Sequence, residues 1–268
     1  MQKDSKIKLN NGIDMPIMGL GTYRAFDGKD VKQVVKWALE AGYRLIDTAM
    51  IYRNEEGVGK GIKEFCEESG IKREEIFITT KLWNSDQGHD NTLKAIDTSL
   101  RKLGMDYVDL YLIHWPTANT DISIVENKRE ETWKAMEEIY KSGKAKAIGV
   151  SNYTIRHLKE MKEYATIQPA VNQVEFHPYL YQRDLLEYCK ENNIALEAYM
   201  PLTSGNRINE ENISEVANKY GKSNAQILLR WSIEHGCIPI PKSNHKKRLE
   251  DNFNIFDFEL SPEDMDKL

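Results

Sequence analysis

The sequence contains few cysteines and no long hydrophobic run. Three cysteines occur among 268 residues, at Cys66, Cys189 and Cys237, and none belongs to a CxxC pair. Because an odd number of dispersed cysteines makes a poor disulfide framework, we expect a reducing, cytoplasmic environment. No stretch approaches the roughly 20 apolar residues that a membrane helix needs, and the first residues hold no apolar signal core. The sequence therefore predicts a protein that is neither secreted nor embedded in a membrane.

The chain also lacks an excess of basic charge and a metal-binding spacing. Its formal net charge is −5, and both signs are interleaved, so nothing indicates a nucleic-acid or membrane surface. One basic cluster, HKKR at 245–248, fits the phosphate of a single small ligand better than nucleic acid. The six histidines show no HxxxH or similar spacing, so we predict no metal site. We expect a small-molecule partner and, since no obligate interface is indicated, a monomer.

Short apolar runs alternate with longer segments of helical periodicity along the chain. Alternating residues on both sides of Asn10, Asn11 and Gly12 predict a short N-terminal β-hairpin. The runs predicted as strands are 17–23, 44–49, 75–82, 108–115, 145–152, 170–176, 194–201 and 237–243. Helical periodicity is clearest at 30–42, 91–104 and 128–143, each of which ends in glycine, at Gly42, Gly104 and Gly143.

About eight strand and helix units without a linker predict a single domain over residues 1–268. Strands that alternate with helices are parallel, and this number of units has the size of a (β/α)8 TIM barrel. A doubly wound open sheet is the alternative. It is disfavoured because GLGTYR, at 19–24, lacks the third glycine of a dinucleotide-binding turn, and GVGKGI, at 57–62, lies inside a helical pattern.

Polar residues stand at the carboxyl ends of the predicted strands, where such barrels place their functional groups. These residues are, in chain order, Asp47, Lys81, His114, Ser151, Asn152, Gln173, Tyr199, Lys242 and Ser243. One polar residue at a strand end is common and does not indicate a site. Polar residues at nearly every strand end, however, should meet in one cavity.

Three of these residues, Asp47, Lys81 and His114, together with the nearby Tyr52, suit the chemistry of a carbonyl group. A tyrosine hydroxyl, with an ordinary pKa of about 10, is a poor proton donor near neutrality unless a cation stabilises its phenolate. Lys81 is the expected cation for Tyr52, and Asp47 is its expected counter-charge. His114 is placed to orient a carbonyl oxygen or to share the proton transfer. This set does not supply a hydride, so a cofactor is required.

Seven segments resemble the aldo-keto reductases, in order and at the spacing of that family over almost the whole chain. They are LIDTAMIYRNEEGVG, TTKLW, LYLIHWP, GVSNY, NQVEFHP, AYMPL and IPKSNHKKRLEDN, and the bacterial glyoxal and 2,5-diketogluconate reductase-like members are the nearest type. The resemblance implies Asp47, Tyr52, Lys81 and His114 as the catalytic residues, with Tyr52 as the proton donor. It implies a pocket lined by Tyr23, Trp83, His114 and Trp115.

The same resemblance implies NADPH/NADP+ as the cofactor. The residues expected to bind it are Gly21, Thr22, Asp47, Ser151, Asn152, Gln173, Tyr199, Pro201, Leu202, Lys242, Ser243, Arg248 and Asn252. Within this set, the resemblance implies that Tyr199 stacks on the nicotinamide and that Lys242, Ser243 and Arg248 hold the adenosine 2′-phosphate. Two departures lie in the following loop, because Met200 stands where the family usually has serine, and Thr203 and Ser204 occupy a place often rich in glycine.

The resulting prediction is NADPH-dependent reduction of aldehydes and ketones to alcohols. We expect a broad substrate range that includes dicarbonyls, because the loop at 117–126 is short and the pocket open. Two alternatives remain open: a lysine-dependent aldolase or lyase that forms a Schiff base on Lys81, and a cofactor-binding regulatory subunit with little turnover. His177, beyond a strand end, is predicted to be structural.

Overall fold

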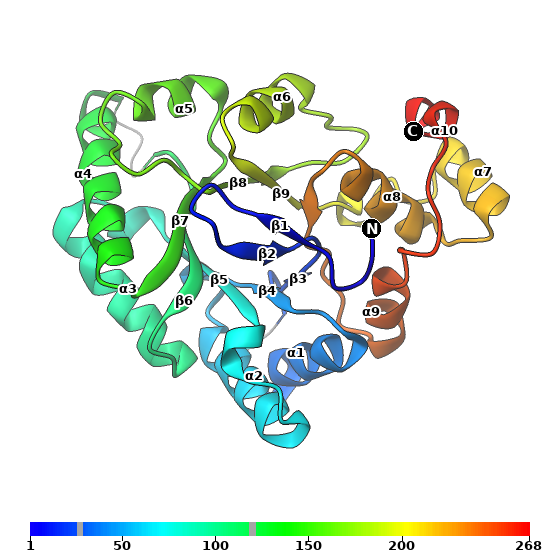
Figure 1. Ribbon diagram of the computed structural model, residues 1–268, viewed down its shortest axis with the longest axis horizontal. Helices are drawn as coiled ribbons and strands as arrows, with labels where there is room; N and C mark the ends of the chain where they lie inside the picture. The colour runs from blue at the N-terminus through cyan, green and yellow to red at the C-terminus, as the bar shows by residue number, and fades with distance from the viewer. Residues whose placement is uncertain (26–28, 118–121) are drawn as a thin grey trace.

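Eight parallel strands form the centre of the molecule (Figure 1). The computed structural model describes residues 1–25, 29–117 and 122–268, and within these ranges each strand of the sheet pairs with the next along the chain. The strands are β3 (Leu20–Gly21), β4 (Leu45–Asp47), β5 (Phe77–Leu82), β6 (Val108–Ile113), β7 (Ala145–Ser151), β8 (Val171–Glu175), β9 (Ala195–Tyr199) and β10 (Ile238–Pro239). The prediction of a (β/α)8 barrel is confirmed.

The two ends of this sheet are joined by backbone hydrogen bonds. Gly19 N donates to Pro239 O and Gly21 N donates to Pro241 O, each at 3.1 Å. Proline has no N–H group. Residues 239 and 241 therefore accept hydrogen bonds from the β3 segment but cannot donate any to it. β3 and β10 are each two residues long, shorter than the predicted strands 17–23 and 237–243.

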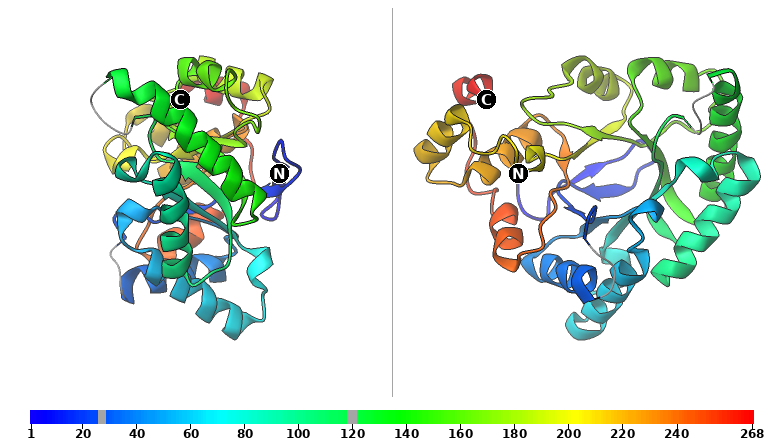
Figure 2. Two further views of the ribbon diagram at one scale, coloured as in Figure 1. Left: turned by 90° about the vertical axis from the view of Figure 1, so that its left-hand side faces the viewer. Right: turned by 180° about the vertical axis from the view of Figure 1, so that it is seen from behind.

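Helices surround the barrel and cover its outer face (Figures 1 and 2). They are α1 (Lys29–Ala41), α2 (Glu55–Ser69), α3 (His89–Leu103), α4 (Ile122–Lys141), α5 (Ile155–Met161), α6 (Arg183–Glu191), α7 (Glu211–Tyr220), α8 (Asn224–Glu234), α9 (Lys246–Phe253) and α10 (Pro262–Lys267). The three predicted helices correspond to α1, α3 and α4, and the glycines after them have positive φ angles of 110°, 66° and 79°. Two helices, α7 and α8, separate β9 from β10.

The predicted short loop at 117–126 is only partly described. Residues 118–121 lie outside the described residues, and α4 begins at Ile122. None of the helices within the described ranges is long and apolar enough to cross a membrane.

The barrel interior is a packed core rather than a pore. Leu45, Phe77, Leu110 and Ile238 belong to one inner apolar cluster, and each is buried. A hairpin of β1 (Lys6–Lys8) and β2 (Asp14–Pro16) confirms the predicted N-terminal element.

This hairpin covers the amino ends of the barrel strands, where Figure 2 shows it at one end of the molecule. Leu9 and Met15 join the inner cluster. Asn10 Nδ2 donates to Pro169 O at 2.9 Å and Asn11 Nδ2 donates to Lys146 O at 3.0 Å, beside the starts of β8 and β7. Because the hairpin covers the amino end of the barrel interior, a ligand that enters the barrel is expected at its carboxyl end.

Candidate active site

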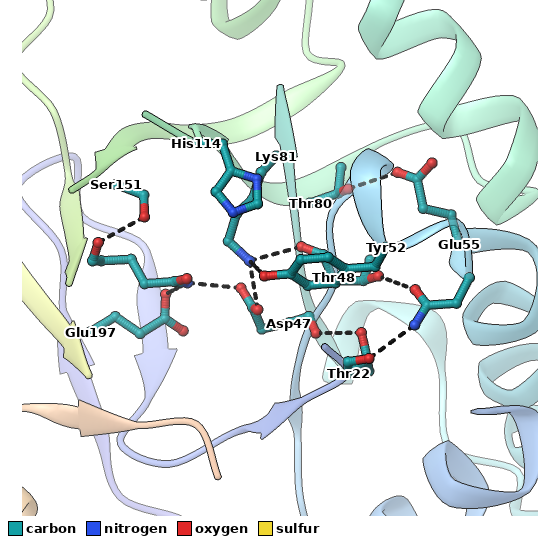
Figure 3. Close-up of polar contacts among 12 residues, drawn as sticks. Thr22, Asp47, Thr48, Tyr52, Glu55, Thr80, Lys81, His114, Ser151 and Glu197 are labelled. Carbon is teal, nitrogen blue, oxygen red and sulfur yellow. Dashed lines mark hydrogen bonds and ion pairs between the residues drawn. The ribbon is translucent and has the colours of Figure 1, made fainter. Parts of the chain in front are cut away.

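A buried lysine and aspartate form the centre of the site at the carboxyl end of the barrel (Figure 3). Asp47 is the last residue of β4, and the parallel register places it opposite Thr79 on β5, two residues before Lys81. Lys81 Nζ donates to Asp47 Oδ1 at 2.6 Å and to Thr48 O at 3.0 Å. Burial lowers the pKa of Lys81, but the charge of Asp47, the neighbouring Tyr52 and the hydrogen bond to Asp47 together outweigh it, so the pKa of Lys81 lies above its usual value.

Tyr52 reaches this pair from the loop after β4. Residues Met50–Tyr52 form one turn of 3-10 helix, and Arg53 then takes a left-handed conformation, with φ 56°. The Tyr52 hydroxyl lies 3.4 Å from Lys81 Nζ, the longest of the contacts that this ammonium group makes.

Two opposing effects set the pKa of Tyr52. Burial raises the pKa of Tyr52, and this effect outweighs the opposing charge of Lys81. Lys81 lowers the Tyr52 pKa, as expected of a cation beside a phenolate, but the net shift is upward because removing a phenolate from water costs more than this cation offsets.

Asn54 ties the Tyr52 loop to the loop after β3, and sequence reasoning did not find it. Its Nδ2 donates to Thr22 O and Ala25 O, each at 2.9 Å, while its Oδ1 accepts from Thr48 Oγ1 at 2.7 Å. Thr22 is fixed a second time, because its backbone N and its hydroxyl both donate to Asp47 O. These bonds hold the two loops at the mouth of the site together.

His114 follows β6 and closes one wall of the site. Its ring lies edge-on to the rings of Tyr52, with centroids 5.7 Å apart, and Trp83, with centroids 5.1 Å apart. Burial, and secondarily the charge of Lys81, lower the pKa of His114 to about 3. The imidazole is therefore neutral at physiological pH, and its buried Nδ1 has no hydrogen-bond partner among the described residues.

The next strands bring together the predicted amide and hydroxyl groups. Ser151 Oγ donates to Gln173 O at 2.8 Å, and Asn152 N donates to the same oxygen at 2.9 Å. Tyr199 OH donates to Asn152 Oδ1 at 2.8 Å. Burial, followed by the charge of Glu175, raises the pKa of Tyr199 to about 12, so its hydroxyl stays protonated in this bond.

Gln173 connects this group to the charged centre. Its Nε2 donates to Asp47 Oδ2 at 2.8 Å and to Glu197 Oε2 at 2.7 Å. Glu197 is completely buried and was not predicted as a site residue. The only signal in the sequence was one carboxylate inside the apolar run 194–201. His177, predicted to be structural, lies beside the site with its Nε2 3.0 Å from the Glu175 carboxylate.

Aromatic side chains line the open rim. Tyr23 is 46% exposed and Trp115 is 41% exposed, and the Tyr23 ring lies 5.1 Å from that of Tyr52. Trp83, whose ring lies 5.1 Å from that of His114, belongs to the same group of aromatic side chains.

The loop after β9 carries an unusual backbone. Pro201 is buried and Leu202 is half-buried. Around them, Met200, Thr203 and Ser204 all have positive φ angles, of 50°, 54° and 53°. These are the positions noted above as departures from the aldo-keto reductase pattern, and glycine adopts such angles without strain.

A group of basic and polar residues lies just before and along α9. Ser243 and Asn252 are buried, whereas Lys242 and Arg248 are exposed. Burial of its amine and the nearby charge of Arg24 lower the pKa of Lys242. Among the side chains that the structure describes, those of residues 1–25, 31–117 and 128–268, no ion pair neutralises Lys242, Arg248 or Arg24. This donor set fits an anionic ligand; within the same ranges, no cluster of three potential metal ligands occurs.

Comparison with known proteins identifies the family. A sequence profile described as the Aldo/keto reductase family matches residues 17–268. The chain belongs to this family. Two similar curated proteins are the glyoxal reductase of Bacillus subtilis (strain 168) and the 9,11-endoperoxide prostaglandin H2 reductase of Trypanosoma cruzi (strain CL Brener). The first is 51% identical over 98% of this chain and 91% of its own length, and the second is 49% identical over 97% and 88%.

Solved structures of aldo-keto reductases have the same fold. The protein from Brucella melitensis is 46% identical, with a TM-score of 0.90 over 98% of this chain and 97% of that one. The Bombyx mori aldo-keto reductase in complex with NADP is 39% identical, with a TM-score of 0.91 over 99% and 92%. As a member of the aldo/keto reductases, this chain is an oxidoreductase that acts on carbonyl and alcohol groups.

Proposed function

We propose that this aldo/keto reductase reduces aldehydes and ketones to alcohols with NADPH, and that Tyr52 is the proton donor. The observation that carries the proposal is the buried chain from Asp47 through Lys81 to the Tyr52 hydroxyl. We further propose that residues 1–268 act as a single domain and as a monomer in the cytoplasm.

The residues present fit the cofactor. Ser151, Asn152 and Gln173 offer hydroxyl and amide groups to the nicotinamide carboxamide, and the Tyr199 ring offers an aromatic face beside them. Gly21 and Thr22 lie at the same end. The charges of Lys242 and Arg248, with Ser243 and Asn252, suit the 2′-phosphate and the adenine, while Pro201 and Leu202 border the remainder. When bound, NADPH supplies the hydride to the carbonyl carbon.

Side chains of the protein donate the proton to the substrate and stabilise the charge that remains. Because burial holds the Tyr52 pKa above its usual value, the hydroxyl carries its proton at neutral pH and can donate it to the substrate oxygen. Lys81 then stabilises the phenolate that remains, and Asp47 keeps Lys81 charged. Neutral His114 orients the carbonyl oxygen against Tyr52 without adding a second cation.

The substrate wall of Tyr23, Trp83, His114 and Trp115 suits a broad range of carbonyl compounds. The similarity to a glyoxal reductase supports dicarbonyls within that range. The Schiff-base alternative is disfavoured, because the ion-paired Lys81 has a raised pKa and a protonated amine is not a nucleophile.

The test is NADPH oxidation followed by absorbance, with a panel of aldehydes and dicarbonyls and with NADH as the comparison. Tyr52→Phe should lower kcat about 100- to 10,000-fold and leave the Kd for NADPH close to unchanged. A variant that keeps most of its rate would remove Tyr52 as the acid. NADPH binding without turnover in the unmodified protein would indicate the regulatory subunit, and an adduct on Lys81 trapped by borohydride would indicate the aldolase.

A further inference from the structure

Glu197 is a carboxyl group buried in the barrel behind the site, and the proton chemistry above does not use it. It lies in the middle of β9, opposite Gln173 in the β8 register, and it is 0% exposed. Oε2 accepts the hydrogen bond from Gln173, and Oε1 has no hydrogen-bond partner among the described residues. A carboxyl group in such a place costs stability unless it has a role or stays neutral.

The bond to Gln173 decides how that amide is oriented. An amide nitrogen has two N–H groups, and Gln173 Nε2 donates one to Asp47 and one to Glu197, at 2.8 Å and 2.7 Å. Both donors are occupied by carboxyl oxygens, so the amide oxygen is left for another partner. Without Glu197, the second donor would lose its acceptor and the amide could rotate.

We propose that Glu197 is a positioning residue, which fixes the Gln173 amide with its oxygen free for the nicotinamide carboxamide and which works as the neutral acid. The inference rests on the proposed function, since it assigns a role at that same site. In the neutral form, the proton sits on Oε1, and Oε2 remains the acceptor for Gln173.

The surroundings of Glu197 favour the neutral form. Burial, and then the charge of Asp47, raise the pKa of Glu197 to about 8, against the opposing effects of Gln173 and Lys81. Asp47 acts from β4, Lys81 from β5 and Gln173 from β8, whereas Ile238, opposite Glu197 on β10, is apolar. The other polar group on β9 is Tyr199, whose hydroxyl is committed to Asn152.

Ionisation of Glu197 would weaken Tyr52, the acid that protonates the carbonyl oxygen during reduction. The Glu197 carboxylate would be a second negative charge, in addition to Asp47, close to Lys81. Negative charge near Tyr52 disfavours its phenolate, so the hydroxyl becomes a weaker proton donor. Carbonyl reduction should therefore slow as Glu197 loses its proton.

Two variants separate the geometric role from the charge. Glu197→Gln keeps an oxygen that accepts from Gln173 but cannot ionise, and Glu197→Leu removes the acceptor. Glu197→Leu should weaken NADPH binding and lower kcat about tenfold each, as expected for one lost hydrogen bond to an amide. Glu197→Gln should recover most of both losses. Glu175→Gln, which changes a half-buried carboxylate of β8 nearby, is the control.

The decisive measurement is kcat from about pH 6 to about pH 10. The unmodified protein and Glu175→Gln should lose rate with an apparent pKa near 8, and Glu197→Gln should keep its rate to higher pH. An unchanged alkaline decline in Glu197→Gln would overturn the neutral-acid part of the proposal. Normal NADPH binding in Glu197→Leu would overturn the positioning part.

Stability of the ligand-free protein provides a readout that needs no activity. A buried carboxyl with a raised pKa holds its proton in the folded state but not in the unfolded state, so stability falls as pH rises toward about 8. The urea midpoint should fall more between about pH 5.5 and about pH 8 in the unmodified protein than in Glu197→Gln. Equal declines would contradict the proposal, and they would do so even if no carbonyl compound were reduced.

Discussion

Lys81 Nζ lies 2.6 Å from Asp47 Oδ1, and both side chains are almost completely shielded from water. Neither charge is stable at this depth without the other, because breaking a buried ion pair leaves one group uncompensated. The pair therefore supports both the fold and the cation beside Tyr52.

Asp47→Asn should lower both stability and activity far more than the loss of an exposed ion pair does. We expect the free energy of unfolding to fall by about 3 kcal/mol and kcat to fall about 100-fold or more, because burial then lowers the pKa of Lys81 and favours the neutral amine. Urea unfolding and NADPH oxidation measure the two effects. Asp14→Asn, which opens an exposed pair with Lys8, should leave both nearly unchanged; equal effects in the two variants would contradict this view.

His114 should make the protein less stable in mild acid. Its pKa is about 3 in the folded protein and about 6.5 in an unfolded chain, so between these values only the unfolded state binds the proton. Stability is therefore lost as pH falls below about 6.5, by about 2 kcal/mol between pH 7 and pH 5. In urea unfolding at both pH values, His114→Gln should lack this component, while the exposed His245→Gln should behave as the unmodified protein does. A full acid decline in His114→Gln would rule out a buried neutral imidazole.

Gly59 should tolerate no side chain. A Cβ atom there would lie 2.6 Å from the carbonyl carbon of Leu103 and would overlap its oxygen, because α2 meets the end of α3 at this point. We expect Gly59→Ala to lower the free energy of unfolding by about 2 kcal/mol or more, despite the better helix propensity of alanine. Glu67→Ala, at an exposed position of α2, is the control in thermal or urea unfolding. A stabilised Gly59→Ala protein would show that the helices can move apart.

Arg248→Ala should reveal the cofactor preference. A charge-assisted contact with the 2′-phosphate is worth about 1.5–3 kcal/mol, so the Kd for NADPH should rise about 10- to 100-fold while the Kd for NADH changes little. Lys247→Ala is the matched control, because the Lys247 ammonium is already paired with Asp251 at 2.8 Å. Equal losses for both cofactors in Arg248→Ala would remove the phosphate contact.

The strands and the location of the site could be predicted because both follow from local patterns. Apolar runs mark strands, and parallel strands bring their carboxyl ends to the same edge, so Asp47, Lys81 and Gln173 were expected together. Their roles, and those of the cofactor residues, stay proposals that the variants above test.

Other features depend on contacts between distant segments. Asn54 bonds to the backbone of Thr22, 32 residues earlier, and nothing in either sequence segment specifies that pairing. The raised pKa of Tyr52 is a balance between burial and the charge of Lys81, and burial is a property of the whole fold. Glu197 was missed for the same reason, since one acidic residue in a strand is not a signal until its neighbours are known.

The plugged amino end of the barrel has a practical consequence for handling the protein. The hairpin of β1 and β2 closes the end opposite the site, and Met1 is 56% exposed. Attachment to a solid support through the first residues would turn the aromatic mouth around Tyr23 and Trp115 toward the solution. Enzyme immobilised in this orientation should remain open to bulky carbonyl compounds, while random coupling through surface lysines would also engage Lys242 beside the basic cluster.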